Sequence, residues 1–333
     1  MIDFRYHLVS IIAVFLALAV GLVVGATALS GKSLEVLQVA QRVALGRIAA
    51  LEHENSNLTS QEKADEAFAN AASSRLVPGL LTGQKVVVVT APGYDSAVAA
   101  GVTKVLLKAG AAVTGQVNIN PAFLQTDGHD EDELTALAQR LAATAGVTLP
   151  AQSASLIGGQ QAAGKVLAAS LLTAGGSGLP SADSTTILQA FSQNDYATFG
   201  NAAHPVSAPA TLAVLVAPGG AAPQAGSQVL VALAVALKNA GSGAVMVGGA
   251  ESVGPKSVIN AEITAGQVST VDNADTEVGQ IMTAQALKLL LDHKQIGHYG
   301  IGPVAAPSPA PTPSSSASQT ATPNVSTSPG GHK

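Results

Sequence analysis

Two histidines near the carboxyl end of the chain carry side chains suited to holding a metal ion. His293 and His298 stand five residues apart, and Met282 lies upstream on a segment expected to be helical. Imidazole and thioether groups are ligands that copper accepts, so these three residues are the candidate metal ligands. Cysteine is absent from the chain, which excludes thiolate metal sites, iron–sulfur clusters and cysteine nucleophiles.

Two acidic segments could either bind a hard cation or begin a helix. The run over residues 127–133 (DGHDEDE) lacks the spacing of an EF-hand, and Asp130 with Glu133 matches a capping box. The run over residues 272–277 (DNADTE) resembles the end of a strand followed by a helix cap. We expect structural roles for both segments, with cation binding as the alternative.

The tripeptide Ala-Pro-Gly follows two of the expected strands, at residues 91–93 and 217–219. Open α/β sheets bind ligands at the carboxyl ends of their strands, which is where these loops would lie. Neither loop matches a glycine-rich phosphate-binding motif, so tight strand-to-helix turns are the favoured interpretation. If a pocket forms there, Tyr94 and Asp95 are the residues to change.

Composition narrows the functional class further. The 333 residues carry a net charge of −5, only 11% are charged and only 3% are aromatic. A nucleic-acid binder would concentrate Lys and Arg, so no nucleic-acid partner is expected. No GxSxG elbow or Ser/His/acid set stands out, so we expect no enzyme and no resident cofactor. The mean hydropathy of +0.35 indicates a membrane segment, buried Ala/Val-rich elements, or both.

An uncharged run over residues 8–29 accounts for part of this hydropathy. As a helix it would be roughly 33 Å long, enough to cross a hydrocarbon core of about 30 Å. We therefore expect residues 1–31 to form a cytoplasmic amino terminus and a membrane anchor, with the body of the chain outside the cytoplasm. The alternative is a cleaved signal peptide, since residues 26–28 (ATA) fit a cleavage site.

Residues 32–75 are predicted to form a coiled-coil helix. Apolar residues recur there with heptad spacing, at positions a and d. The seam consists of Leu34, Leu37, Gln41, Ala44, Ile48, Leu51, Asn55 and Leu58. A buried Asn55 at position a would fix register, which favours a parallel homodimer or a coiled coil with another envelope protein. The alternative is one amphipathic helix packing on its own domain.

Residues 84–300 are predicted to form an α/β domain around a doubly wound, mostly parallel sheet. Continuous apolar strands such as 85–89 and 212–216 are typical of strands buried on both faces. Two similar βαβ-like halves, 84–120 and 210–250, suggest a weak internal repeat. Further elements complete the pattern: strand 268–271 and helices 130–145, 155–173, 184–193 and 279–291.

Residues 301–333 are rich in Pro, Ser and Thr and are expected to be disordered, because such a composition cannot bury a core.

Both ends of the chain resemble one known family. Residues 1–21 (MIDFRYHLVSIIAVFLALAVG) closely resemble the start of the actinobacterial copper transporter family known as MctB. Residues 269–276 (STVDNADT), 279–280 (GQ) and 297–300 (GHYG) are similar to its carboxyl-terminal portion, so the resemblance covers about residues 1–300.

The resemblance implies a membrane protein of copper homeostasis or efflux, with copper as the ion transported or sensed. Relatives are also linked to an envelope complex acting in cell growth and division. The alternative is therefore a non-enzymatic, dimeric envelope scaffold that acts through its coiled coil.

Overall fold

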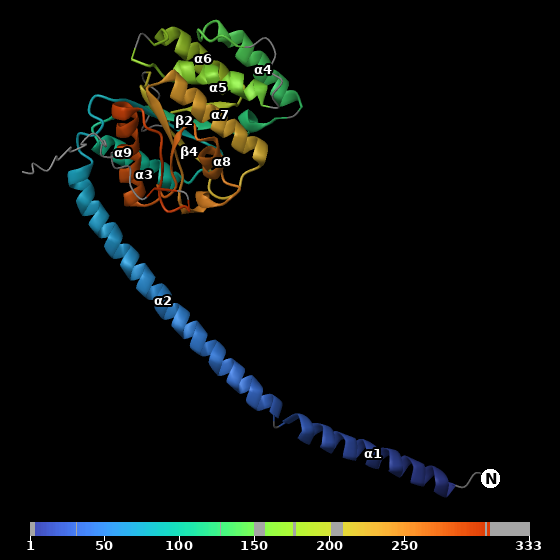
Figure 1. The fold of residues 1–333 in the computed structure, drawn as a ribbon. Coiled ribbons are helices and arrows are strands. Elements are labelled where there is room, and N and C mark those ends of the chain that lie inside the picture. The colour runs from blue at the N-terminus through green and yellow to red at the C-terminus, as the bar shows by residue number, and fades with distance from the viewer. Residues whose placement is uncertain are drawn as a thin grey trace, which may run out of the picture. The chain divides into compact units, whose positions relative to one another are not determined.

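A computed structural model describes residues 4–30, 32–126, 128–149, 157–175, 178–200, 209–303 and 305–306 of the chain. The chain divides into two compact units, Met1–Ala67 and Phe68–Lys333. The first unit holds α1 (Phe4–Ser30) and most of α2 (Lys32–Leu76), and the second holds a layered α/β domain (Figure 1).

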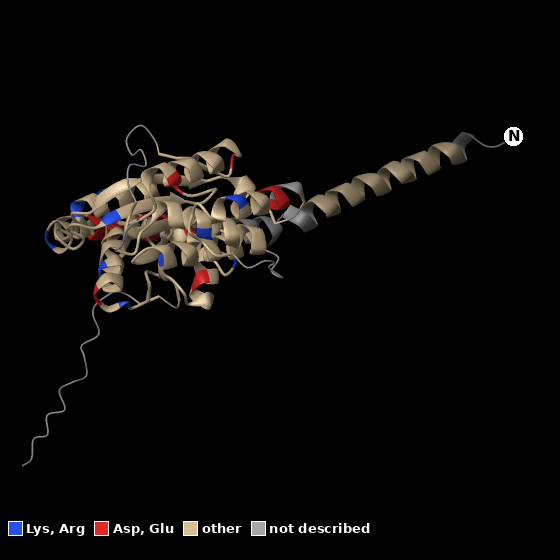
Figure 2. Cartoon of the chain, turned by 90° about the horizontal axis from the view of Figure 1, so that it is seen from above, with Lys and Arg blue, Asp and Glu red and all other residues tan. Residues whose placement is uncertain are grey.

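The helix α1 has the length and composition of a membrane span. Its stretch Tyr6–Ala26 is 21 residues long, strongly apolar and not buried. Figure 2 shows no Lys, Arg, Asp or Glu along this stretch. A signal sequence would have the same properties near an amino terminus, so the structure supports a candidate span and leaves both interpretations of this segment open.

The helix α2 runs for 45 residues and ends at Leu76, two residues before Pro78. It ends there because proline disfavours a helical conformation in the residue before it, here Val77. Its last turns belong to the α/β unit, where Ala69 and Ser73 are buried. The sequence-based prediction of one helix over residues 32–75 is confirmed, whereas a coiled coil needs a partner helix.

Seven strands form one sheet in the order β3-β2-β1-β4-β5-β6-β7. Neighbouring strands are parallel except for β2 and β3, which are antiparallel. This confirms the expected mostly parallel sheet. The strands are β1 (Lys85–Thr90), β2 (Ala112–Ile119), β3 (Ala197–Phe199), β4 (Leu212–Val216), β5 (Gly243–Val247), β6 (Ser269–Val271) and β7 (His298–Tyr299).

Helices cover both faces of the sheet (Figure 1). One face carries α3 (Ser96–Lys108) and α9 (Glu277–His293). The opposite face carries the larger core and the remaining α-helices of this unit. These are α4 (His129–Ala142), α5 (Gly158–Leu171), α6 (Ser181–Gln193), α7 (Gln224–Ala240) and α8 (Val258–Ala265), with short 3₁₀ turns at Pro121–Leu124 and Ala250–Val253.

The apolar run of β1 serves both cores at once. Val87 and Val89 join the core beneath α5 and α7, whereas Val86 and Val88 join the core beneath α3 and α9. Successive side chains of a strand point to opposite faces. A strand covered on both faces must therefore be apolar at every position, as the sequence predicted.

The connection from β6 through α9 to β7 lies on an unusual face of the sheet. The connections through α7, α8 and α9 all step in the same direction across the sheet, yet α9 lies on the opposite face from α7 and α8. The crossover through α9 therefore has the opposite handedness to the crossovers through α7 and α8. This handedness is rare among connections between parallel strands. As a consequence α9 packs beside α3, where Gly101 leaves room for the side chain of Gln280.

The sequence analysis missed two strands and one α-helix, and it misplaced several helix boundaries. Strands β3 and β7 and helix α8 were not expected, because each is short and lacks a strong apolar pattern. Helix α4 begins at His129 with Gly128 in the capping position, so the prediction of Asp130 as the cap is wrong. Asp127 lies outside the described residues.

The ordered domain also extends beyond residue 300. Ala306 forms a parallel bridge with Tyr299, and its N–H donates to the carbonyl of His298 at 2.6 Å. The expected start of the disordered tail at residue 301 is therefore wrong, because the chain returns to the sheet edge. Residues 307–333 lie outside the described residues.

Candidate functional site

The two Ala-Pro-Gly loops meet at the carboxyl edge of the sheet, where the strand order reverses between β1 and β4. The N–H of Ala91 donates to the carbonyl of Val216 at 2.9 Å, and Tyr94 forms an isolated antiparallel bridge with Pro218. Gly93 has a φ of +78° and faces Pro218. The loops are tight turns that pack against each other.

The loop after β1 nevertheless borders a hollow of about 590 Å³. Tyr94 lines this hollow together with residues of α3 and with Gln116 of β2. Asp95 does not line it, since its carboxylate accepts a 2.7 Å hydrogen bond from the N–H of Ala97 and caps α3. Of the two residues singled out in this loop, Tyr94 faces a cavity and Asp95 has a structural role.

The acidic segment 272–277 joins β6 to α9 as expected. Thr276 caps α9, and its hydroxyl accepts from the N–H of Gly279 at 3.1 Å. The buried carboxylate of Asp272 accepts hydrogen bonds from the N–H groups of Ile301 (2.7 Å) and Gly302 (3.0 Å). Asp272 thus holds the turn that follows β7, a long-range contact that no local pattern could predict.

A buried acidic group also links three helices. The carboxylate of Glu277 lies 3.9 Å from the ammonium groups of both Lys104 and Lys108 on α3. Lys108 in turn donates to the hydroxyl of Ser73 at 2.8 Å. The pairing ties the amino end of α9 and the last turns of α2 to α3, which is a structural role.

The candidate metal ligands lie on different elements. His298 is half-buried on β7, with its Nδ1 3.0 Å from the hydroxyl of Thr270. Burial lowers its pKa below the usual 6.5, so the ring is neutral at pH 7, which is the form that ligates metals. His293 is exposed at the last residue of α9.

Met282 is not placed with His293. It is buried in the core between α9 and the sheet, and it precedes His293 by eleven residues of one helix, a rise of roughly 16 Å. The two side chains cannot therefore ligate the same ion. Among the residues that the structure describes, no three His, Asp or Glu side chains cluster closely enough to hold a metal.

Glu262 of α8 is a fully buried carboxyl that the sequence analysis missed. Its Oε1 accepts from the N–H groups of Gln267 (2.9 Å) and Val268 (2.5 Å), which fixes the turn into β6. Its Oε2 is buried without a hydrogen-bond partner among the described residues. Burial raises the pKa of this carboxyl above its usual value, against the opposing effect of the two backbone hydrogen bonds.

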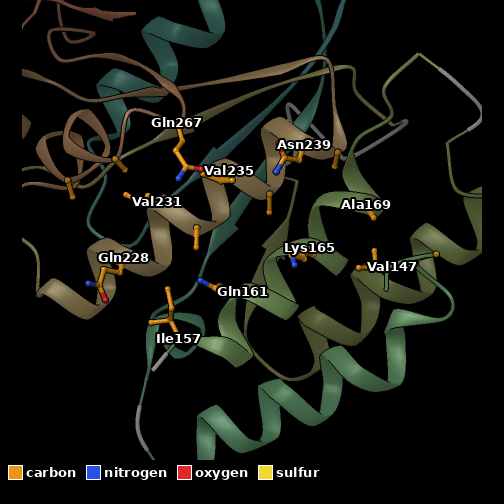
Figure 3. A pocket seen from close by; sticks show the side chains of 17 residues that line it. Val147, Ile157, Gln161, Lys165, Ala169, Gln228, Val231, Val235, Asn239 and Gln267 are labelled. Atoms are coloured by element: carbon orange, nitrogen blue, oxygen red, sulfur yellow. The ribbon is translucent and has the colours of Figure 1, made fainter. Parts of the chain in front are cut away.

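A second hollow is a groove of about 840 Å³ on the opposite face of the domain, between α5 and α7 (Figure 3). Its walls are mostly Ala and Val, including Val231 and Val235, with amides such as Gln161 and Gln267 among its polar residues. Lys165 is the single charged side chain among the described residues that line it. These residues include no paired nucleophile and base, and they offer a ligand mainly apolar contact.

The heptad seam of α2 is exposed where its side chains are described. Ile48, Leu51 and Leu58 are 51%, 62% and 58% exposed, and Asn55 is exposed as well. The side chains of Leu34 and Leu37 lie outside the described residues. The seam therefore has no cover from the described part of this chain.

The protein family described as "Copper transport outer membrane protein, MctB" matches residues 1–309. The chain belongs to the MctB family. It is 32% identical to the copper transporter MctB of Mycobacterium tuberculosis over 312 residues, which cover 91% of this chain and 97% of that protein. The copper transporter MctB of Mycobacterium leprae is 33% identical over the same shares.

Membership of the MctB family confirms the resemblance seen at both ends of the sequence. The matched residues include α1, α2 and the α/β domain. Together with the apolar stretch Tyr6–Ala26, the family match supports a location in the membrane or cell envelope. The family is described by transport rather than by catalysis.

Proposed function

We propose that this protein acts in copper homeostasis as a membrane-anchored protein of the cell envelope. The observation that carries the proposal is the family match over residues 1–309, which includes the candidate anchor, the long helix and the domain together. The two relatives from Mycobacterium, each matched over 97% of its own length, are named as copper transporters. The chain therefore shares with them every part that a common role would need.

Copper content in cells lacking the protein tests this role. Under copper load, we expect the deletion strain to accumulate more copper and to tolerate less of it, and we expect the full-length chain to restore both. Cellular copper and zinc are measured together by mass spectrometry, with zinc as the control. Unchanged copper content and tolerance in the deletion strain would contradict the proposal.

Direct copper contact is assigned in this proposal to His293 and His298. His293 is exposed and His298 is neutral at pH 7, so both can offer an imidazole nitrogen where α9 ends and β7 begins. Copper titrated into the full-length chain in detergent should bind about tenfold more weakly after His293→Ala or His298→Ala. His53→Ala on α2 and Met282→Leu serve as controls, and equal affinities in all four variants would exclude these ligands.

We further propose that α2 pairs with a second copy of the chain as a parallel coiled coil. The exposed Ile48, Leu51 and Leu58 carry this proposal, because burying each such side chain contributes about 1.5–3 kcal/mol. Two anchors in one membrane would hold the helices in the same direction. This dimer is the scaffold through which the domain would meet other envelope proteins.

The absence of cysteine makes the dimer directly testable. A single Ile48→Cys or Leu51→Cys substitution places one thiol at the seam, whereas His53→Cys places it on the opposite face of the helix. Oxidation in membranes should cross-link the two seam variants and leave the His53→Cys chain monomeric. Equal cross-linking at all three positions, or none at the seam, would contradict a parallel dimer.

A further inference from the structure

A row of polar side chains crosses the carboxyl end of the sheet on the face that carries α3. Asn118 of β2 lies at its centre, and its Oδ1 accepts from the hydroxyl of Thr90 and from the amide of Gln116, both at 2.8 Å. The Asn118 amide donates to the hydroxyl of Thr198 on β3 at 3.2 Å. Gln116 also donates to the hydroxyl of Tyr94 at 3.4 Å.

Packing within the sheet does not account for this row. Strands covered on both faces are mostly apolar, as residues 86–89 of β1 and all of β4 are. On β2, Val117 and Ile119 join the core beneath α5, whereas the alternate residues Gln116 and Asn118 are only half-buried. Thr198 beside them is exposed. The polar row therefore lies at the end of the sheet where α/β folds of this strand order bind ligands.

Two residues of the row, Tyr94 and Gln116, line the hollow of about 590 Å³, a volume within the range of about 300–1,000 Å³ usual for ligand sites. Helix α3 supplies both apolar side chains (Ala99, Ala100 and Leu107) and polar ones (Ser96, Thr103 and Lys104) to the same hollow. A ligand that fits must carry an apolar face and a polar edge.

The hydrogen bonds within the row fix which groups face outward. The Tyr94 hydroxyl accepts from Gln116, and the Thr198 hydroxyl accepts from Asn118, so each can still donate its own proton. Because the amides hold these hydroxyls in place, a ligand need not order them on binding. The row thus presents oriented donors to the hydroxyl oxygens of a ligand.

Charge at the hollow disfavours an anionic ligand. The amino terminus of α3 is already capped by the carboxylate of Asp95, which offsets the positive end of the helix dipole. Lys104, which lines the hollow, lies 3.9 Å from the carboxylate of Glu277. None of the described residues that line the hollow carries an imidazole, thioether or carboxylate, the groups that would ligate copper or another metal ion.

We propose that this hollow binds a neutral sugar unit. A sugar ring has C–H faces that fit against Ala99, Ala100 and Leu107 of α3 and a rim of hydroxyls that can bond to Tyr94 and Gln116. The site does not depend on copper and is separate from the heptad seam of α2. It gives the domain a means of docking on envelope polysaccharide.

Binding is tested with the full-length chain in a detergent that contains no sugar. Cellotriose, maltotriose and chitotriose are titrated separately by calorimetry. At least one of the three should bind saturably at a single site. Gln116→Leu should weaken binding about tenfold, since it leaves hydrogen-bonding groups of the ligand unpaired. Tyr94→Phe, which removes a hydroxyl that lines the hollow, should weaken it severalfold.

Gln161→Leu in the groove between α5 and α7 is the matched control, since it removes an amide from the other hollow. It should leave sugar affinity unchanged. The unfolding temperatures of all variants show whether a variant has lost binding alone or its folded structure as well. If Gln116→Leu does not fold, the affinity of Tyr94→Phe tests whether the hollow binds the sugar. The proposal is overturned if none of the three sugars binds, if Tyr94→Phe binds like wild type, or if a trimer of galacturonic acid binds more tightly.

Discussion

The carboxylate of Asp272 shows how one residue joins two distant parts of the chain. It stands directly after β6, yet both of its oxygens bond to backbone N–H groups of the turn after β7. Gly300 in that turn has a φ of +133°, and an added Cβ there would collide with the same carboxylate. The acidic residue and the glycine form one unit although they are 28 residues apart.

Replacing this carboxylate should destabilise the domain. In Asp272→Asn, an amide N–H faces one of the two backbone donors, so a buried hydrogen bond is lost. We expect the free energy of unfolding in urea to fall by about 1–3 kcal/mol. Asp292→Asn breaks an exposed ion pair with Lys288. This control should change the free energy of unfolding by under about 0.5 kcal/mol. Equal losses in the two variants would contradict this role of Asp272.

Glu262 should make stability depend on pH. Because burial raises its pKa above 4.5 in the folded chain, the folded state binds a proton more tightly than the unfolded state. Its contribution to stability is therefore fully present below pH 4.5 and is lost as pH rises through the folded pKa.

Glu262→Gln keeps an oxygen for the two backbone donors and removes the titration. The variant should gain stability relative to wild type as pH rises above 4.5, and the gain should level off once the wild-type carboxyl is ionised. Urea unfolding of both chains from pH 4 to pH 8 measures this difference. A difference that stays constant across the series would show that Glu262 does not titrate in that range.

At the scale of elements, the helix α9 depends on close backbone packing at its start. Gly279 is the third residue of α9, and a Cβ there would collide with the backbone carbonyl of Asn273. Gly226 is the third residue of α7, and a Cβ there would meet nothing within 4 Å. The same residue type at the same helical position therefore has opposite constraints.

Alanine substitutions at these two glycines should have opposite signs. Gly279→Ala should lower the unfolding free energy by about 1–3 kcal/mol, because backbone cannot move aside as a side chain can. Gly226→Ala should raise it by about 0.5–1 kcal/mol, because alanine restricts the unfolded chain and favours the helix. Thermal unfolding of the two variants provides the comparison, and a stabilised Gly279→Ala chain would contradict the packing described.

At the scale of the whole molecule, the first unit should retain its amino-terminal helix in the membrane, with the domain outside the cytoplasm. In the cysteine-free chain, Thr264→Cys adds a thiol at an exposed position of α8. A membrane-impermeant maleimide should label this variant in intact cells. Ile2→Cys should be labelled only after lysis.

The two cysteine variants also separate an anchor from a signal peptide. A cleaved segment would remove the thiol of Ile2→Cys, so no label would appear on the mature chain even after lysis. Labelling of Thr264→Cys only after lysis would instead place the domain on the cytoplasmic side. Both results would contradict the arrangement that we propose.

Strong local patterns allowed much of the fold to be predicted. The apolar runs of β1 and β4 were found as expected. The strand expected over residues 268–271 is present as β6. In each case the apolar run lies within one short segment, so the signal needs no distant partner.

The candidate site was predicted less completely. Tyr94 was singled out from its loop and does border a hollow, but Gln116, Asn118 and Thr198 were not recognised. Polar residues within strands carry no local signal of a site. They acquire one only when neighbouring strands bring them into one row.

The sequence by itself determined the apolar amino-terminal segment, the long helix, the mostly parallel α/β character and the family, because each rests on composition, period or residues read in order. Only the tertiary structure decided that α9 crosses on the face of α3, that Asp272 holds a turn 28 residues away, and that Met282 is apart from His293. These contacts join residues far apart in the chain. They depend on which surfaces the helices and strands bury together, and local propensity does not specify that choice.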